Sequence, residues 1–369
     1  MAFIVPLYGL GGVSLLPFLW DFHKERGYAQ CGDKGGVNVE NVKYLGVDLG
    51  GTKLMVGEMD GGGRLLRTQK HPTGPLTQRE ALALIERSLD EFLENGRPDE
   101  NTAAIGLGLV GRVDSGSGTW LEIEPGREDP LPVGKILSER CGLPCFLDND
   151  VRSAVKAELL FGRGRDTEDM IYINVGTGIA AGTVTGGRLV TGGHFNAGEV
   201  GHTASGIEFR APCVCGRPDC VEPVASGLGL DRSARLLAAQ YPGTKLAIPA
   251  DGTRVSAADI FALYDDDPLC RVLTDNAAQA LANLIMNLVR VSDPDTVVLG
   301  GGVMSSGFLY PKVLERLNRH TMRYVTHGVV LTELDPAFIG ILGACSNAKM
   351  GKQMQEKPTG YDDLRKSCC

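Results

Sequence analysis

Residues 44–54 read Tyr-Leu-Gly-Val-Asp-Leu-Gly-Gly-Thr-Lys-Leu, an apolar run with one carboxylate that meets a pair of glycines. This order predicts a strand, a tight turn and a second strand. Gly50 and Gly51 lack a β-carbon, so the backbone can turn sharply there and approach a ligand closely. Exposed N–H groups in such a turn suit phosphate oxygens, and Thr52 and Lys53 add a hydroxyl and a positive charge. A phosphate-binding turn is one interpretation, and a plain glycine hairpin is the other.

The carboxylate of this stretch, Asp48, lies near the end of the first predicted strand. Mg²⁺ prefers carboxylates and water as its ligands. Asp48 is therefore a candidate to hold a hydrated magnesium ion beside the turn, unless its presence there is incidental.

The composition limits the possible functions. The chain has 369 residues, enough for two or three domains, and 43% of them are hydrophobic. Its net charge of −8 argues against a nucleic-acid partner, whose phosphates need a basic surface. Most of the ten cysteines are scattered, unlike those of a small disulfide-rich secreted scaffold. We therefore expect a cytoplasmic protein with one metal site.

The first 41 residues do not fit the rest of the pattern. Residues 1–20 are apolar but lack a basic leader and a clear cleavage site, which argues against a signal peptide. Pro6 and Pro17 interrupt this run, which argues against a membrane span. We expect residues 1–41 to be a poorly ordered extension outside the fold.

Two strand–turn–strand units, at 44–56 and 170–184, each begin a half of mixed strands and helices. This repetition predicts an α/β protein with two similar lobes across a cleft, each offering a glycine turn to a polyphosphate. Helices are expected over 79–94, 133–140, 151–160, 256–263, 268–291, 309–319 and 337–349.

Asp150 follows an apolar strand and precedes the helix predicted over 151–160. Active-site residues of open α/β sheets gather at such carboxyl ends of strands. We interpret Asp150 as a general base, which accepts the proton of a substrate hydroxyl while the hydroxyl oxygen attacks the γ-phosphate of a nucleotide. Asp150 would also suit the N-cap of the helix, and both roles can hold at once.

Three cysteines and a histidine lie close together in the sequence: His202, Cys213, Cys215 and Cys220. Three thiolates and one imidazole match a closed tetrahedral zinc site. Four protein ligands leave no open coordination position, so the zinc would be structural. Ordinary core cysteines are the alternative, although the cluster lies among polar and charged residues.

Two carboxylates, Glu199 and Glu222, flank this segment together with His202. Fixed hydrogen-bond acceptors suit the several hydroxyls of a sugar. A zinc-anchored loop over 199–222 would hold these groups rigidly, which favours a binding role over plain surface charges.

Several motifs together resemble the ROK family of sugar kinases and sugar-responsive repressors, which has the actin/hexokinase-like fold. The motifs run in family order over about residues 42–348. They are Asp48-Leu-Gly-Gly-Thr-Lys53, Leu147-Asp-Asn-Asp150, Gly176-Thr-Gly178, Gly198-Glu-Val-Gly-His202, Cys213-x-Cys-Gly-x3-Cys220-x-Glu222 and Val298-Leu-Gly-Gly-Gly302.

The resemblance implies two ribonuclease H-like lobes around a nucleotide and sugar cleft. It implies ATP, Mg²⁺, and transfer of phosphate to a hexose 6-hydroxyl by a homodimer. Asp150 would be the base, and the sugar contacts would be Asn149, Glu199, His202 and Glu222, with His202 also bound to zinc. The phosphates would lie against Gly50, Gly51, Thr52, Lys53, Gly176, Thr177 and Gly178, and the adenosine near Gly301.

We accordingly expect a small lobe over 42–150, a large lobe over 151–336, a helix over 337–350 that returns to the small lobe, and a polar tail over 351–369. Neither a nucleic acid nor a membrane is expected as a partner.

One region departs from the family pattern. Gly108-Leu-Val-Gly111 stands where family glucokinases have Gly-x-Pro-Gly, and Glu122 replaces an Asn that bonds a sugar hydroxyl. An anionic Glu could pair with a substrate ammonium by a charge-assisted hydrogen bond. We therefore hypothesise an amino-hexose such as kanosamine or glucosamine, with glucose as close competitor. The alternative is that Glu122 points to solvent.

A sugar-responsive repressor and a non-catalytic sugar sensor are the alternatives to a kinase. A sugar-responsive repressor carries an N-terminal helix-turn-helix module with basic helices, whereas residues 1–41 are short, glycine-broken and apolar. A non-catalytic sugar sensor would bind sugar without turning over ATP.

Overall fold

The computed structural model describes residues 41–93, 98–208 and 212–356. The chain divides into two units, Met1–Val37 and Asn38–Cys369, and every element below belongs to the second. The expectations for residues 1–40 and 357–369 lie outside the described ranges.

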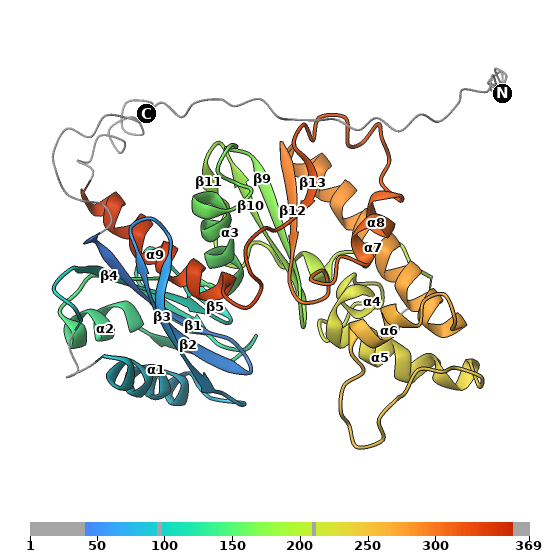
Figure 1. Cartoon of the computed structure of the whole chain (residues 1–369), viewed down its shortest axis with the longest axis horizontal. Helices are drawn as coiled ribbons and strands as arrows, with labels where there is room; N and C mark the ends of the chain where they lie inside the picture. Colours follow the sequence, from blue (N-terminus) through green and yellow to red (C-terminus); the bar gives the residue numbers. More distant parts are fainter. Residues whose placement is uncertain (1–40, 94–97, 209–211, 357–369) are drawn as a thin grey trace. The chain divides into compact units, whose positions relative to one another are not determined.

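The stretch around Asp48 forms the centre of a mixed sheet, as its pattern predicts (Figure 1). The strand order is β3-β2-β1-β4-β8, and β1 pairs antiparallel with β2 and parallel with β4. The strands are β1 (Lys43–Leu49), β2 (Lys53–Asp60), β3 (Leu65–Pro72), β4 (Thr102–Leu109) and β8 (Cys145–Asn149).

The second half contains a sheet of the same design, in the order β11-β10-β9-β12-β13. Here β9 pairs antiparallel with β10 and parallel with β12, as β1 does with β2 and β4. The strands are β9 (Met170–Val175), β10 (Ile179–Thr185), β11 (Arg188–Leu189), β12 (Thr296–Gly300) and β13 (Gly328–Leu331). The prediction of two similar α/β lobes is confirmed.

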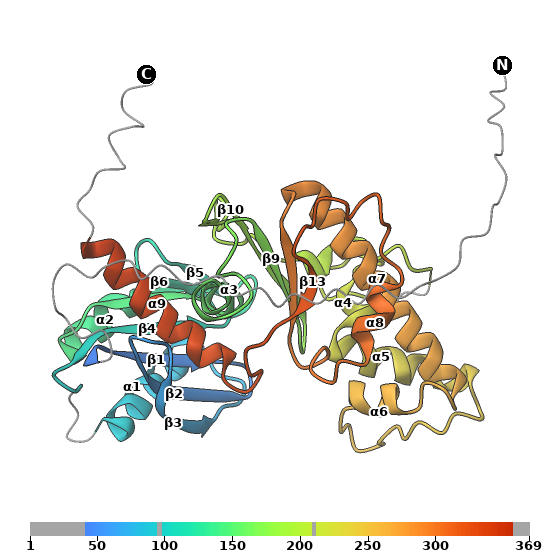
Figure 2. The same ribbon diagram turned by 45° about the horizontal axis from the view of Figure 1, so that its top comes forward.

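Helices cover both faces of the first sheet (Figures 1 and 2). Alternate side chains of a strand point to opposite faces, and Leu45, Val47 and Leu49 of β1 pack in one core with α1 (Gln78–Phe92) and α2 (Val133–Cys141). The opposite face is covered by α3 (Asp150–Phe161) and α9 (Ile339–Glu356).

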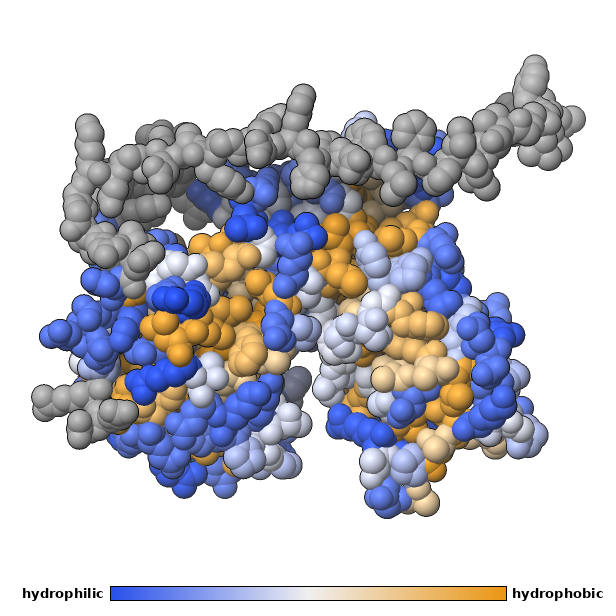
Figure 3. Space-filling model, in the orientation of Figure 1, coloured by the Kyte–Doolittle hydropathy of each residue, from blue (hydrophilic) through white to orange (hydrophobic). Residues whose placement is uncertain are grey.

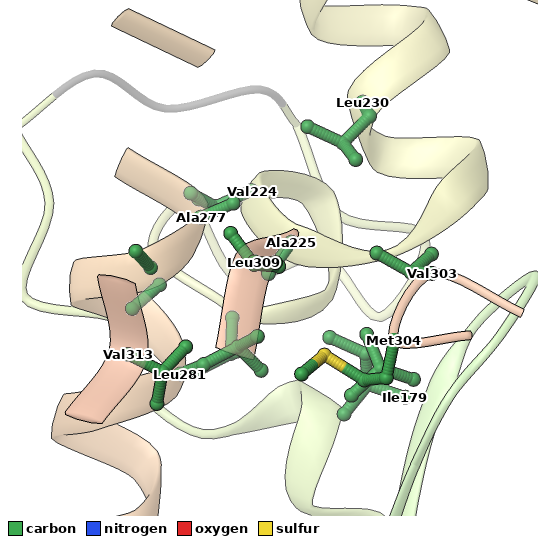
Figure 4. Close-up of a cluster of buried hydrophobic side chains, with 14 of the residues drawn as sticks. Ile179, Val224, Ala225, Leu230, Ala277, Leu281, Val303, Met304, Leu309 and Val313 are labelled. Carbon is green, nitrogen blue, oxygen red and sulfur yellow. The ribbon is translucent and has the colours of Figure 1, made fainter. Parts of the chain in front are cut away.

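The second lobe has a core built around a long helix, α7 (Pro268–Ser292). Shorter helices complete it: α4 (Glu222–Ala225), α5 (Gly227–Leu237), α6 (Ala257–Ala262) and α8 (Leu309–Leu314). Figure 4 shows Val224 of α4, Leu281 of α7 and Leu309 of α8 in this cluster of buried side chains.

The helix α3 contacts both sheets. Its Val155 packs in one buried cluster with Met170 and Tyr172 of β9, and its other neighbours include β4, β8 and α9. The residues at the start of α3 are therefore held by both lobes.

The helix α9 lies directly on the first sheet because glycines leave room for it. A β-carbon on Gly106 of β4 would stand 1.9 Å from the carbonyl oxygen of Ala344, and one on Gly46 of β1 would stand 2.6 Å from the Sγ of Cys345. Larger residues at these two positions would push the helix away from the strands.

The structure corrects two expectations about elements and adds a sheet that was not expected. α8 ends at Leu314 rather than near residue 319, and α9 continues to Glu356, so residues 351–356 are helical and not part of a polar tail. A small sheet also forms that the pattern does not predict, from β5 (Arg112–Asp114), β6 (Thr119–Glu122) and β7 (Glu128–Leu131). Strands this short give too few residues for a period of two to stand out.

Among the described residues, no helix is long and apolar enough to cross a membrane. On the face drawn in Figure 3, apolar residues reach the surface in separate patches among hydrophilic ones.

Candidate active site

A cavity of about 1160 Å³ brings together residues from both lobes. The predicted residues that line it are Gly51, Thr52, Glu122, Asn149, Asp150, Thr177, Gly178, Glu199, His202, Cys215 and Glu222. The other predicted site residues are not part of its lining: Asp48, Gly50, Lys53, Gly176, Cys213, Cys220 and Gly301. A volume of this size exceeds that of a typical drug-sized ligand pocket.

The N-terminus of α3 places Asp150 in the cavity wall. Asn149, not Asp150, is the N-cap: its Oδ1 accepts from the N–H groups of Val151 at 2.9 Å and Arg152 at 3.3 Å. The suggestion that Asp150 caps the helix is therefore wrong, because the preceding amide takes that position. Burial raises the pKa of Asp150 to about 6, and the charge of Glu199 adds to the shift.

Asn149 has few hydrogen-bonding groups left for a sugar. Its Nδ2 donates to the carbonyl of Gly111 at 2.9 Å, while its Oδ1 serves as the helix cap. Its side chain lines the cavity in this fixed orientation.

The carboxylate of Asp48 is close enough to Asp150 for the charge of Asp150 to affect its ionisation. Burial and the charge of Asp150 together raise the pKa of Asp48 to about 7, against the opposing charge of Lys53. A β-carbon on Gly340, in the first turn of α9, would stand 2.2 Å from Asp48 Oδ2. A carboxylate whose ionisation is disfavoured by the charge of a second carboxylate lies in a setting that a divalent cation would neutralise, so the residues fit a magnesium ion.

The two predicted glycine turns join equivalent strands of the two sheets. The turn after β1 is closed by the N–H of Gly50, which donates to the carbonyl of Lys53 at 3.0 Å. The turn after β9 is closed in the same way, from Gly176 to the carbonyl of Gly178 at 3.0 Å. No atom outside its immediate neighbours in the described chain lies within 4 Å of where a β-carbon on Gly51 would stand, so a ligand has room there.

The two carboxylates that are predicted to bind the sugar, Glu199 and Glu222, differ in their contacts within the protein. Glu222 Oε2 accepts from the N–H of Ile179 at 2.9 Å, which fixes it against the second turn. Glu199 Oε2 lies 3.9 Å from Nε2 of His202. Burial raises the pKa of Glu199, although His202 lowers it.

The four predicted zinc ligands come together. The ligand atoms of His202, Cys213, Cys215 and Cys220 all lie within 4.8 Å of one another. Nδ1 of His202 is 3.3 Å from Sγ of Cys213, and the Sγ atoms of Cys215 and Cys220 are 3.5 Å apart. Ligands about 2.0–2.3 Å from a tetrahedral zinc ion would be separated by similar distances, so the residues fit zinc.

The carboxylate of Glu122 is already occupied. Its Oε1 accepts from Nε of Arg112 at 2.8 Å, and its Oε2 accepts from the N–H of Gly126 at 3.2 Å. Arg112 also pairs with Glu128. Glu122 lines the cavity, and it shares the positive charge of Arg112 with Glu128.

The sequence interpretation misses a buried ionic cluster beneath the site. Asp148 is 1% exposed, and it pairs with Nε of Arg152 at 2.5 Å and with Nζ of Lys156 at 2.7 Å. Burial would raise the pKa of Asp148, but the two cations outweigh it and hold the pKa below its usual value. Arg152 and Lys156 lie four residues apart on one face of α3, and Asp148 lies at the end of β8 just before that helix. Two basic residues at helical spacing after a strand-end carboxylate are the signal that could have revealed this cluster.

A family model described as "ROK family" matches residues 44–350. The chain belongs to the ROK family. This membership confirms the resemblance and, with the paired sheets, the actin/hexokinase-like fold.

Relatives within the ROK family include sugar kinases. A glucokinase of Thermotoga maritima is 30% identical over 84% of this chain and 98% of its own length. An N-acetylmannosamine kinase of Escherichia fergusonii is 31% identical over 72% of this chain and 85% of its own.

Solved ROK structures include both enzymes and regulators. A Streptomyces griseus glucokinase in complex with glucose and AMPPNP is 27% identical, with a TM-score of 0.66 over 84% of this chain and 100% of that one. A ROK family transcriptional regulator, a homologue of the Escherichia coli MLC protein, is 26% identical, with a TM-score of 0.71 over 85% of this chain and 79% of that one.

Proposed function

We propose that this ROK protein transfers the γ-phosphoryl group of ATP to the 6-hydroxyl of a hexose, with Asp150 as general base. The observation that carries the proposal is the shared cavity. One wall contains the half-buried carboxylate of Asp150, whose pKa is raised to about 6, and the same lining includes Thr52 and Gly178 from the two glycine turns. A base poised near the working pH and a cradle for phosphates are the parts that phosphoryl transfer needs.

In the proposed reaction, Asp150 takes the proton of the sugar 6-hydroxyl as its oxygen bonds to the γ-phosphorus. The bond from the γ-phosphorus to the bridging oxygen breaks, and ADP leaves with that electron pair. A magnesium ion near Asp48 would balance the charge of the phosphates. Backbone N–H groups of the two turns would orient the phosphate oxygens, and Gly301, whose φ is 92°, would lie near the adenosine.

The sugar side of the cavity supports a polyhydroxylated substrate. Glu199, His202 and Glu222 all line it, and His202 turns one ring nitrogen toward the cysteines and the other toward Glu199. We propose that a structural zinc ion fixes His202 and, through it, the sugar contacts. We also infer a cytoplasmic homodimer, as in the family resemblance.

The test is ADP release with Mg·ATP across glucose, mannose, fructose, glucosamine, kanosamine, N-acetylglucosamine and N-acetylmannosamine. Turnover with at least one neutral hexose is expected, and NMR of the product should place the phosphate on the 6-oxygen. Sugar binding without ADP release, in folded protein that is loaded with zinc, would instead support a sensor or a regulator. Specific DNA binding at low salt would favour the regulator.

An amino-hexose is the second candidate, because Glu122 lines the cavity. Since both carboxylate oxygens of Glu122 already accept hydrogen bonds within the protein, we expect Glu122→Gln to change the ratio of kcat/KM between glucosamine and glucose by less than about threefold. A loss of tenfold or more confined to the amino sugars, equal to about 1.4 kcal/mol, would show that Glu122 binds an ammonium. Glu139→Gln, which changes an exposed carboxylate of α2 outside the lining of this cavity, is the matched control.

A further inference from the structure

Phe195 has an uncommon backbone conformation at the edge of the cavity. Its φ of 58° lies in the left-handed region, which bulky L-residues rarely adopt. Asp293, the other described non-glycine residue with positive φ, simply ends α7 as its C-cap. Phe195 lines the cavity four residues before Glu199, and strained residues of this kind persist only where neighbours hold them.

Arg152 is the neighbour that holds this turn. Its side chain is 3% exposed, and Nη1 donates to the carbonyl of Phe195 at 3.0 Å. Nη2 donates to the carbonyl of Val113 at 2.8 Å, and Nε pairs with Asp148. A planar guanidinium with partners on three sides has a fixed orientation, so α3, β5 and the 194–196 turn are fastened together at one point.

The neighbouring carbonyl in the turn has a similar partner. Arg112 Nη1 donates to the carbonyl of His194 at 3.4 Å, while Glu122 and Glu128 hold the rest of that guanidinium. Successive carbonyls of the turn are thus bound by arginines from β5 and α3. These two contacts are separate from the hydrogen bonds that form α3 and from the cluster of four metal-ligand candidates.

We propose that Arg152 is a positioning residue that holds the 194–196 turn in its left-handed conformation and thereby sets the sugar side of the cavity. The inference rests on the proposed sugar-binding function. Lys156 provides the comparison, because it pairs with the same Asp148 but bonds Asn347 of α9 instead of the turn.

The test combines Arg152→Met with changes at Phe195. Arg152→Met should raise the sugar KM about tenfold and change kcat by less than about threefold, whereas Lys156→Met should leave KM within twofold. Adding Phe195→Gly to Arg152→Met should restore much of the KM, because glycine adopts the left-handed conformation without strain. Adding Phe195→Ala should not restore it, because alanine keeps the β-carbon while also removing the ring.

Unfolding without sugar separates this proposal from the proposed function. Arg152→Met should lower the unfolding midpoint more in the Phe195→Gly background than in the Phe195→Ala background, since only alanine has strain to release when the turn relaxes. The role of Arg152 would be overturned if Arg152→Met lowered the unfolding midpoint equally in the two backgrounds. Equal KM values for the two double variants would overturn it as well. Absence of turnover in the unaltered protein would overturn the kinase instead, and the unfolding comparison would still decide whether Arg152 holds the turn.

Discussion

Asp150→Asn is expected to lower kcat by about 10²–10⁴-fold, the contribution typical of a positioned general base. The amide cannot accept the proton of the sugar hydroxyl, but it has nearly the same shape as the carboxylate. The sugar KM and the unfolding temperature should therefore change little. An assay of ADP release would check the loss of kcat, and calorimetry of sugar binding would check that the affinity for the sugar is kept. Asp293→Asn makes the same chemical change at the C-cap of α7 and should leave kcat unaltered.

The ionisation of the Asp150 carboxyl group predicts how kcat/KM falls at low pH. Only the carboxylate form of Asp150 can act as base, and its pKa is raised to about 6. The kcat/KM value should therefore fall about tenfold per pH unit below pH 6, where the carboxylate takes up a proton, and level off above it. A profile that stays flat down to pH 5 would mean that Asp150 keeps an ordinary carboxyl pKa or is not the base.

Cys215→Ser is expected to release the zinc ion and to lower the stability of the second lobe markedly. Structural zinc sites contribute on the order of 10 kcal/mol of apparent binding free energy at neutral pH, much of which stabilises the fold. Cys215 is exposed, so this substitution removes little packing and its effect reports the metal. Metal analysis should find about one zinc per chain before the change and much less after it.

Cys141→Ser is the matched control for the zinc prediction. Cys141 is a partly buried free cysteine at the end of α2, outside the cluster of four ligands. The control should keep its zinc and its unfolding temperature. Folded, active protein that contains no zinc would contradict a structural metal.

Much of the fold follows from local patterns. The β1 stretch predicts its own strand and turn because apolar alternation and adjacent glycines are local signals, and its counterpart at 170–184 shows that the design is repeated. The cluster proposed to bind zinc is equally evident, because three of its four residues lie within eight positions, Cys213 to Cys220.

The surroundings of the predicted site residues do not follow from local patterns. Glu122 stands between Leu121 and Ile123, and the sequence leaves open whether its carboxylate faces a substrate or solvent. Only the pairing of β5 with β6 brings Arg112 beside it. The N-cap is similar: Asp and Asn are both good caps, so the sequence Asp148-Asn149-Asp150 does not tell which of its side chains caps α3.

The contact of α9 with the first sheet has a consequence for how the protein is made. β1 and β4 leave the ribosome about 230 or more residues before α9, yet α9 covers one face of their sheet and meets Gly46 and Gly106 directly. Closing so long a loop is entropically costly, and contacts of high sequence separation form slowly. The first lobe therefore waits, with part of one sheet face uncovered, until α9 has been made, and chains that stop before Ile339 expose that part to aggregation and to chaperones.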